Sequence, residues 1–289
     1  MLDIKSLIAG GPVILDGGWG TQLQGFGLKV GAHPDLWNLS APEKVEQVAR
    51  AYVEAGSRVI LTNTFGATKF TLEKHGYGGR VAEVNRAGVE ISKRATTGTP
   101  TKVFASMGPT GIMLMMGEVK PEELYDAFLE QAAAIAEAGA DAIVVETMSD
   151  PAEAELAVQA AKTTGLPTAV SFVFDSGRNQ DRTMMGTTPE QVVQRMTDAG
   201  ADIIGSNCGQ GIDGFIPICR RMRAVTTLPI WMKANAGLPE VVDGVTVYRQ
   251  SPELFAEKAR ELVEAGANFI GGCCGTSPDF IRALSKITA

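Results

Sequence analysis

Three of the four cysteines in this 289-residue chain stand where apolar, strand-like segments end. Cys208 follows Ile-Ile-Gly-Ser-Asn, and the adjacent Cys273 and Cys274 follow Phe-Ile-Gly-Gly. A lone cysteine at such a place usually packs in a core. A Cys-Cys pair among glycines has space around it instead, and three thiolates with one open position are the donor set of a catalytic zinc site.

Binding of one metal by two adjacent cysteines needs a special backbone, because neighbouring side chains on a strand point to opposite faces. Gly271, Gly272 and Gly275 surround the pair and permit the chain to turn there. Two other uses of Cys273 and Cys274 fit the same spacing. One is redox chemistry, and the other is phosphate binding in the loop after the last strand of a barrel.

A zinc site made of three thiolates suits one kind of reaction. A substrate thiol that takes the fourth position loses its proton there and stays nucleophilic, which gives an alkylatable thiolate at neutral pH. Zinc sites that activate water usually have His or carboxylate ligands. The two histidines, His33 and His75, are expected at the surface or in loops, away from the strand ends, and Cys219 is expected in the core on a helix over 215–225.

A recurring phrase sets the framework that positions these cysteines. An acidic residue, Ala and Gly end a helix and an apolar strand follows, which happens four times along the chain. The four glycines are Gly56, Gly139, Gly200 and Gly266. Each interval between them has room for two strand–helix units of roughly 30 residues. The phrase therefore marks every second strand of a repeating βα pattern.

The intervening strands and the helices complete this pattern. Further strands are predicted at 13–18, 102–108, 167–174 and 228–234, and amphipathic helices at 42–55, 122–138, 189–199 and 252–265. Eight units predict an α/β fold, a single (β/α)8 TIM barrel spanning residues 1–289, with a doubly wound open sheet as the alternative. In a barrel, the chemistry is expected at the carboxyl ends of the strands.

Composition narrows the partners and the compartment. The net charge is −7 with acidic and basic residues interspersed, so neither nucleic acid nor an anionic membrane is expected to bind. The N-terminus has no signal-peptide pattern, and no apolar run approaches the roughly 18 residues of a membrane span. A cytoplasmic protein is expected, in which the cysteines are reduced.

The motifs at the predicted strand ends resemble those of the homocysteine S-methyltransferase family. In chain order they are Leu-Asp-Gly-Gly-Trp-Gly-Thr at 15–21, Thr-Asn-Thr-Phe-Gly-Ala at 62–67, Gly-Pro-Thr-Gly at 108–111, Glu-Thr-Met-Ser-Asp at 146–150, Ser-Asn-Cys at 206–208, Asn-Ala-Gly-Leu-Pro at 235–239 and Gly-Gly-Cys-Cys-Gly-Thr at 271–276. The likeness covers nearly the whole chain. Within the family it is strongest to the homocysteine-binding domain of cobalamin-dependent methionine synthase.

The resemblance implies a zinc-dependent methyltransferase that activates homocysteine or a similar thiol as a zinc-bound thiolate. Cys208, Cys273 and Cys274 would be the catalytic zinc ligands. Glu146 would receive the amino group of homocysteine, although a carboxylate there could also be a helix cap or a salt-bridge residue. The other implied substrate-binding residues are Asp16, Gly17, Gly18, Trp19, Asn63, Thr64 and Asn235.

Four of these residues carry more specific expectations. Backbone N–H groups near Gly17–Gly18 would receive the carboxylate of the amino acid, and Asn235 would lie near the metal. Trp19 stands where relatives often have a smaller residue or a different aromatic, so its indole could narrow the pocket. The segment 112–116, rich in methionine, is expected either to cover the barrel mouth or to pack as an ordinary loop.

The methyl donor is the least determined part of this hypothesis. The sequence ends after the last predicted helix, so a methylcorrinoid would arrive on a separate protein that a folate-dependent methyltransferase subunit recharges. A betaine-like donor ranks second, with Trp19, Trp37 and Tyr77 as walls of a cage. A sulfonium donor ranks third, because Gly275 stands where that branch tends to have Arg. A non-catalytic thiol-binding subunit is the remaining alternative.

Overall fold

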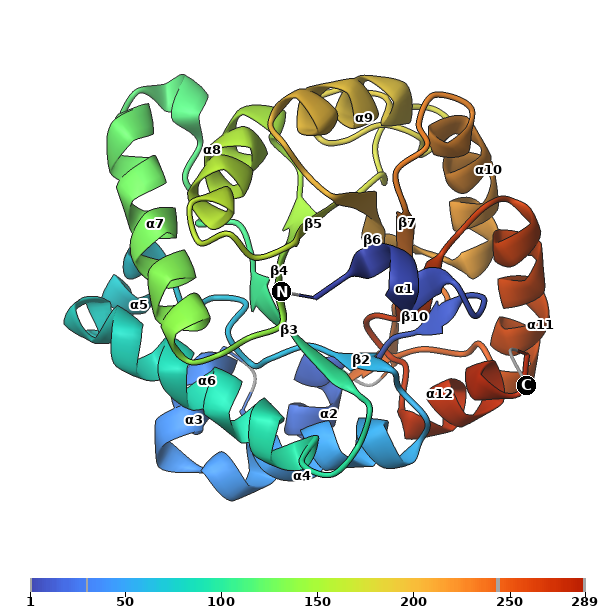
Figure 1. Ribbon diagram of the computed structural model, residues 1–289, viewed down its shortest axis with the longest axis horizontal. Coiled ribbons are helices and arrows are strands. Elements are labelled where there is room, and N and C mark those ends of the chain that lie inside the picture. The colour runs from blue at the N-terminus through green and yellow to red at the C-terminus, as the bar shows by residue number, and fades with distance from the viewer. Residues whose placement is uncertain (1, 30, 243–244, 288–289) are drawn as a thin grey trace.

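The computed structural model describes residues 2–29, 31–242 and 245–287 and shows eight parallel strands surrounded by helices (Figure 1). The strands are neighbours in the order β1-β10-β7-β6-β5-β4-β3-β2. Their bounds are β1 Val13–Ile14, β2 Val59–Ile60, β3 Lys102–Met107, β4 Ala142–Met148, β5 Thr168–Phe172, β6 Ile203–Gly211, β7 Ile230–Asn235 and β10 Phe269–Gly272. A short antiparallel hairpin, β8 Glu240–Val242 with β9 Val245–Val247, follows β7.

One large helix follows each barrel strand and packs on the outside of the barrel. These helices are α4 Pro42–Glu54, α6 Val81–Ala95, α7 Pro121–Glu137, α8 Pro151–Lys162, α9 Pro189–Asp198, α10 Ile212–Arg223, α11 Pro252–Glu264 and α12 Pro278–Ser285. Shorter ones are α1 Ile4–Ile8, α2 Trp19–Gly25, α3 Trp37–Ser40, α5 Lys69–Glu73 and the 3₁₀ turns Pro34–Leu36, Gly78–Arg80 and Leu114–Met116. The predicted (β/α)8 TIM barrel is confirmed, and the open-sheet alternative is wrong.

The recurring helix-end phrase has the expected physical basis. An alanine caps the C-terminus of each of α4, α7, α9 and α11, and the next glycine adopts a positive φ between 86° and 105°. A side chain would be strained in that left-handed conformation, so glycine stops the helix and redirects the chain into a strand. Within the described residues, no helix is long and apolar enough to cross a lipid bilayer.

A side chain joins the first and second strands of the barrel. The backbone N–H of Arg58 donates to the carbonyl of Ile14 at 2.8 Å. Asp16 is two positions after Ile14. Its carboxylate accepts a hydrogen bond from the N–H of Leu61, which directly follows β2, at 2.7 Å. Asp16 therefore continues, with its side chain, the pairing between β1 and β2 that the backbone begins.

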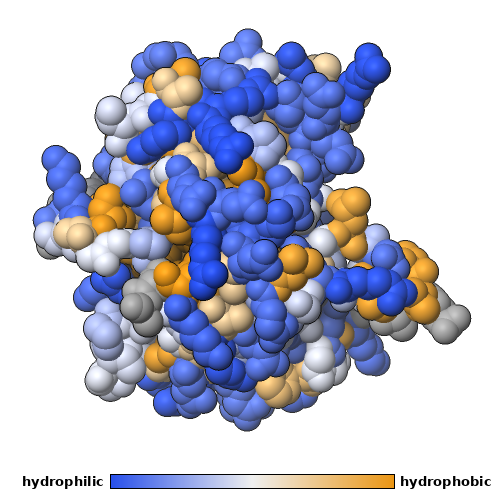
Figure 2. Space-filling model, turned by 90° about the vertical axis from the view of Figure 1, so that its right-hand side faces the viewer, coloured by the Kyte–Doolittle hydropathy of each residue, from blue (hydrophilic) through white to orange (hydrophobic). Residues whose placement is uncertain are grey.

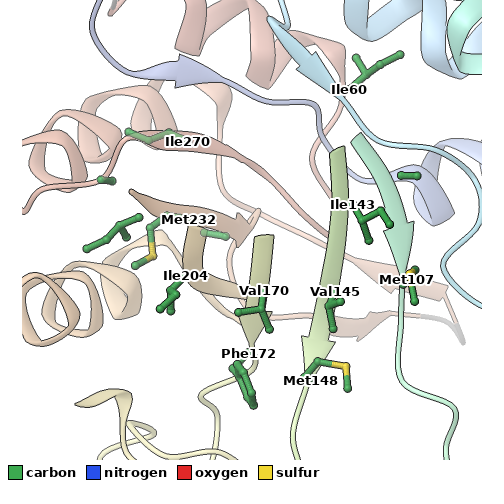
Figure 3. Packing of buried hydrophobic residues seen from close by; sticks show 14 of the residues in the cluster. Ile60, Met107, Ile143, Val145, Met148, Val170, Phe172, Ile204, Met232 and Ile270 are labelled. Carbon is green, nitrogen blue, oxygen red and sulfur yellow. The ribbon is translucent and has the colours of Figure 1, made fainter. Parts of the chain in front are cut away.

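The barrel has an apolar layer outside its strands and another inside. The outer layer includes Ile143, Val170 and Met232, which face the surrounding helices (Figure 3). Inside the barrel, the ring of Trp231 lies 6.0 Å from that of Phe104 and 5.5 Å from that of Phe269. Leu7 of α1 belongs to this inner cluster. The polar residues inside the barrel pack against this inner apolar layer.

We predict that Gly205→Ala destabilises the barrel. Gly205 is on β6 in the inner layer, and an added Cβ would lie 1.8 Å from the carbonyl oxygen of Trp231. Backbone must move to admit it, so the free energy of unfolding should fall by about 3 kcal/mol, the upper end of ordinary overpacking. Chemical denaturation measures this, with Gly79→Ala, which has open space, as the control. Equal stability of the two variants would contradict the packing of β6 against β7.

Candidate active site

A layer of polar side chains lies directly above the apolar inner layer. Successive inward residues on a strand are two positions apart, and one such step leads from Phe104 to Ser106, from Val144 to Glu146 and from Trp231 to Lys233. The same step places Ser171 on β5 and Asn207 on β6. All of these polar residues are buried. The carboxyl-terminal half of the barrel therefore holds a polar site on an aromatic floor.

The cysteines converge because β7 lies between the two strands that carry them. In the ladders, Lys233 of β7 is paired with Asn207 of β6 on one side and with Gly271 of β10 on the other. Cys208 follows Asn207 with φ 62°, a left-handed conformation that turns its side chain from the regular strand direction. Cys273 and Cys274 follow the end of β10. The three sulfur atoms lie within 4.8 Å of one another.

The predicted turn at the cysteine pair is observed, and several hydrogen bonds hold it. The N–H of Cys273 donates to the carbonyl of Ala234 at 2.7 Å, and that of Cys274 donates to Oδ1 of Asn235 at 3.1 Å. Gly275 follows with φ 79°. An added Cβ on Gly272 would lie 2.2 Å from the hydroxyl of Thr276. The glycines are therefore required by close contacts as well as by backbone conformation.

The pKa values of the three thiols shift in different directions. The sulfur of Cys208 lies close to those of Cys273 and Cys274, and interaction with these two thiols lowers the pKa of the Cys208 thiol. Cys208 in turn raises the pKa of Cys274 and holds that of Cys273 well above its usual range. One thiolate forms readily, while two thiols keep their protons unless a cation replaces them. Within the described residues, these three form the cluster that could hold a metal ion.

A cavity of about 520 Å³ leads to the sulfur atoms. Its inner part is lined by the three cysteines, Glu146, Lys233 and the segment Gly17–Trp19. Its outer part is lined by residues of the loops after β1 and β2, including His33, Phe65 and His75. The volume is that of a small-molecule site, and it suits a compact substrate with part of a second reactant.

Two charged side chains line this cavity, Glu146 from β4 and Lys233 from β7. Burial raises the pKa of Glu146, while Lys233 and a hydrogen bond from Ser106 lower it, and the net shift is upward. Burial lowers the pKa of Lys233, but Asp16 and Glu146 raise it more, so the net shift is again upward. Lys233 is an ammonium group at neutral pH. Glu146 is a carboxylate that lacks a full counter-charge and favours a cationic ligand.

The structure brings most of the predicted site residues to the cavity. Gly17, Gly18, Trp19, Asn63 and Glu146 line it together with the cysteines. Asn235 lies beside the cysteines and fixes the backbone of Cys274, as described above. The indole of Trp19 is a wall of the cavity, and its N–H donates to Asp16 at 2.7 Å.

Asp16 and Thr64 require corrections. Asp16 is fully buried behind the cavity wall, where its carboxylate accepts from Lys233, Trp19 and the N–H of Leu61. The hydroxyl of Thr64 is likewise buried and donates to the carbonyl of Ser106 at 2.7 Å. Neither side chain is on the cavity surface. Their hydrogen bonds join neighbouring strands, which a motif alone does not reveal.

The expected carboxylate site at the glycines also changes. The N–H of Gly18 donates to the hydroxyl of Thr276 at 3.0 Å, so it is already used. This bond holds the β1 loop against the segment after β10. The N–H of Gly18 is therefore a weaker candidate for the carboxylate of a substrate than the sequence indicated, while a carboxylate site at the N–H of Gly17 stays a prediction.

Both histidines lie in loops, as predicted. These loops nevertheless bring them to the outer cavity, where their rings are 4.7 Å apart. Nδ1 of His33 lies 2.9 Å from the carboxylate of Asp35, and Nε2 lies 3.0 Å from the carbonyl oxygen of Gly66. Burial lowers the pKa of His33, but these acceptors raise it more. His33 thus ties together the loops after β1 and β2.

Two aromatic residues proposed for a cage are elsewhere. Trp37 lies beneath the ammonium of Lys44, at 4.8 Å from ring centroid to Nζ, and Tyr77 lies beneath the guanidinium of Arg80, at 5.2 Å. Neither lines the cavity. Cys219 is buried on α10 as predicted, and burial raises the pKa of its thiol to about 12.

Sequence reasoning missed Lys233 and Asn207. Asn207 accepts from the N–H of Thr147 at 2.8 Å and from Ser171 at 2.6 Å, and its amide nitrogen lies 4.0 Å from the sulfur of Cys273. Asn207 therefore links β4 and β5 to the cysteine site. The signal for both residues was present, because each is a polar residue at an inward position of a strand that is otherwise apolar.

The fold and the site define a (β/α)8 barrel with a three-thiol site at the carboxyl ends of its strands. The chain matches the family described as homocysteine S-methyltransferase over residues 13–288. It therefore belongs to the homocysteine S-methyltransferase family.

Individual relatives agree with this assignment. Methionine synthases of Mycobacterium leprae (strain TN) and Mycobacterium tuberculosis (strain ATCC 25618 / H37Rv) are each 28% identical over 303 aligned residues. These alignments cover 99% of this chain but 25% of each synthase, so the chain spans about a quarter of their length. The metallated homocysteine methyltransferase MmuM of Escherichia coli has the same fold, with a TM-score of 0.79, 23% identity and 96% of both chains covered.

We predict that Glu146→Gln stabilises the protein at neutral pH. The folded state raises the pKa of Glu146 above its ordinary value of 4.5. Above that value, the unfolded chain loses this proton more readily than the folded one, so stability falls as the pH rises through the window between the two pKa values. Glutamine removes this effect and can still accept from Ser106.

Denaturation curves at several pH values test this prediction. The difference between the variant and the wild type should be small at pH 4 and should grow as the pH approaches 7. Glu130→Gln, on the exposed face of α7, is the matched control and should show no such trend. A variant that is less stable than the wild type at pH 7 would contradict a strained carboxylate at this position.

Proposed function

We propose that this chain is a zinc-dependent homocysteine S-methyltransferase in which Cys208, Cys273 and Cys274 hold the metal. One observation carries the proposal. Three thiols converge at the inner end of a cavity whose opposite wall presents Glu146, in a chain of the homocysteine S-methyltransferase family. We further propose that the barrel as a whole, residues 1–289, is the unit that binds both metal and acceptor.

The geometry of the three sulfur atoms fits a zinc ion. With Zn–S bonds of about 2.3 Å, sulfur atoms around a tetrahedral ion lie about 3.8 Å apart. The sulfur atoms of Cys208 and Cys274 are 3.9 Å apart, and all three lie within 4.8 Å. Small rotations of the side chains would complete the coordination. A set of three soft thiolates favours zinc over the hard cations magnesium and calcium.

Bound at these cysteines, zinc would supply a fourth position at which the thiol of the acceptor loses its proton and remains nucleophilic. The protein does the rest. Glu146 receives the ammonium group of the acceptor, which sets the direction of the side chain towards the cysteines. Asn207 lies against Cys273 and steadies it. Trp19 and Phe65 exclude water from the path by which the donor approaches.

Transfer of the methyl group is then a direct displacement. The sulfur of the acceptor forms its bond to the methyl carbon as the bond between that carbon and the donor breaks. The products are the methyl thioether and the demethylated donor. Because no group of the protein takes the methyl, catalysis consists of thiolate activation and alignment of the two reactants.

The barrel mouth has the surface expected for a large donor. Twelve large hydrophobic side chains are exposed among the described residues. Eleven of them lie between a barrel strand and the large helix that follows it, or in the first turn of that helix. These connecting segments are at the same end of the barrel as the cavity. They include Met113, Met115, Met184, Leu238 and Val241. Elsewhere the surface is mostly hydrophilic, as Figure 2 shows for one side.

This distribution supports a donor that is carried on another protein, because concentrated apolar exposure marks interaction surfaces. We propose that the donor is a methylcorrinoid on a separate protein, recharged by a folate-dependent methyltransferase subunit. The cavity is less suited to a small onium donor, because Trp37 and Tyr77 do not line it and cannot form the walls of an aromatic cage there. An Arg in place of Gly275 is also excluded locally, since an added Cβ would lie 2.2 Å from the ring of Tyr248.

We predict that the protein binds about one zinc ion per chain and that Cys208→Ser, Cys273→Ser and Cys274→Ser each lose it. Homocysteine methylation should disappear with the metal, because the acceptor thiol is no longer deprotonated. Metal content is measured by mass spectrometry after dialysis. Cys219→Ala is the control, since it removes one cysteine far from the site and should keep the zinc. Full activity after complete removal of zinc would refute the proposal.

A panel of donors tests the second half of the reaction. Zinc-loaded protein is given homocysteine with methylcobalamin, betaine or S-methylmethionine, and methionine is measured. We expect product with methylcobalamin and none above background with the two small donors. Efficient turnover with either small donor would contradict the corrinoid assignment. Homocysteine binding without turnover on any donor would favour a non-catalytic thiol-binding subunit.

A further inference from the structure

Lys233 has an unusual place in this site. It is on β7 at an inward position, almost completely buried, and it lines the cavity beside Glu146 and Cys273. A lysine is seldom buried to this extent unless its charge is compensated. The reaction proposed above uses the cysteines and Glu146, and the ammonium group of Lys233 has no role in it.

The counter-ion of Lys233 also accepts hydrogen bonds from two other donors. Asp16 accepts the ammonium of Lys233, the indole N–H of Trp19 and the backbone N–H of Leu61. Lys233 has three N–H donors, and among the described residues Asp16 is its single hydrogen-bond partner. Two donors of a buried ammonium therefore remain for a ligand or for water in the cavity.

Glu146 and Lys233 face the same cavity without an ion pair between them. Glu146 accepts from Ser106, and Lys233 donates to Asp16. The two charges are nevertheless near enough to affect each other's pKa. An α-amino acid carries its ammonium and its carboxylate on one carbon. A carboxylate and an ammonium that both line one small cavity, each with capacity to spare, are the complement of that pair.

One of the backbone groups that might otherwise take the carboxylate is engaged elsewhere. The N–H of Gly18 donates to Thr276. The other lysine at the cavity, Lys74, is exposed in its outer part. We infer that Lys233 binds the carboxylate of the acceptor, so that the site selects thiols that are α-amino acids. This inference rests on the proposed homocysteine methylation and adds the residue that binds the carboxylate of the acceptor.

Analogues of homocysteine that each lack one charged group test this role. 3-Aminopropane-1-thiol lacks the carboxylate, and 4-mercaptobutanoate lacks the ammonium. Binding of the three thiols to zinc-loaded protein is measured by calorimetry, which needs no donor. The wild type should prefer homocysteine to 3-aminopropane-1-thiol by about 10- to 100-fold, the range for a hydrogen bond between charged groups.

Lys233→Gln should abolish this preference for a carboxylate and should keep the preference for homocysteine over 4-mercaptobutanoate. Lys233→Arg, which keeps the charge, should retain part of the carboxylate preference. Lys74→Gln is the matched control and should leave it unchanged. Zinc content is measured for every variant. The comparison of analogues on the wild type stands even if a substituted protein does not fold.

Three results would overturn the inference. The wild type could bind 3-aminopropane-1-thiol as tightly as homocysteine, Lys233→Gln could weaken all three thiols equally, or Lys74→Gln could remove the carboxylate preference. In each case thiol binding and methylation would persist, so the proposed function would stand. If no thiol bound to the zinc-loaded wild type, the proposed function would fail as well.

Discussion

The ladders that strand β7 makes with β6 and β10 are the constraint on which the site depends. Cysteines that are far apart in sequence meet because β7 holds their two strands in a fixed register, with Lys233 level with Asn207 and Gly271. Beyond that row both outer strands leave the regular conformation, at Cys208 by a positive φ and at Cys273–Cys274 by a turn. A shift of either ladder by one residue would separate the sulfur atoms.

The second consequence of this architecture is a set of buried charges above an aromatic floor. Asp16, Glu146 and Lys233 together carry one excess negative charge where water is scarce. Such groups are costly to bury unless their partners are complete. Asp16 accepts three hydrogen bonds and joins three strands, whereas Glu146 and Lys233 keep unused capacity at the cavity. Asp16 thus stabilises the barrel, while Glu146 and Lys233 are the charged groups available to a ligand.

The sequence was sufficient for the barrel, because each helix end repeats a local signal: a glycine with positive φ before an apolar strand. The cysteine site was also accessible, since strand ends meet at one face of a barrel. The roles of Asp16 and Thr64 were not, because their partners come from other strands and depend on three-dimensional register. The nearness of His33 to the cavity was not foreseen for a similar reason, since a long loop after β1 returns to the cavity. Lys233 was visible in the alternation of β7 and could have been predicted.

The central claim is that three cysteines hold zinc and leave one position for the thiol of the acceptor. Zinc K-edge X-ray absorption of the metal-loaded protein measures this directly, because it counts the sulfur atoms around the ion. We predict three sulfur neighbours at about 2.3 Å before homocysteine is added and four afterwards. A sulfur count that does not change on addition of homocysteine, or a zinc ion without cysteine sulfur, would contradict the account.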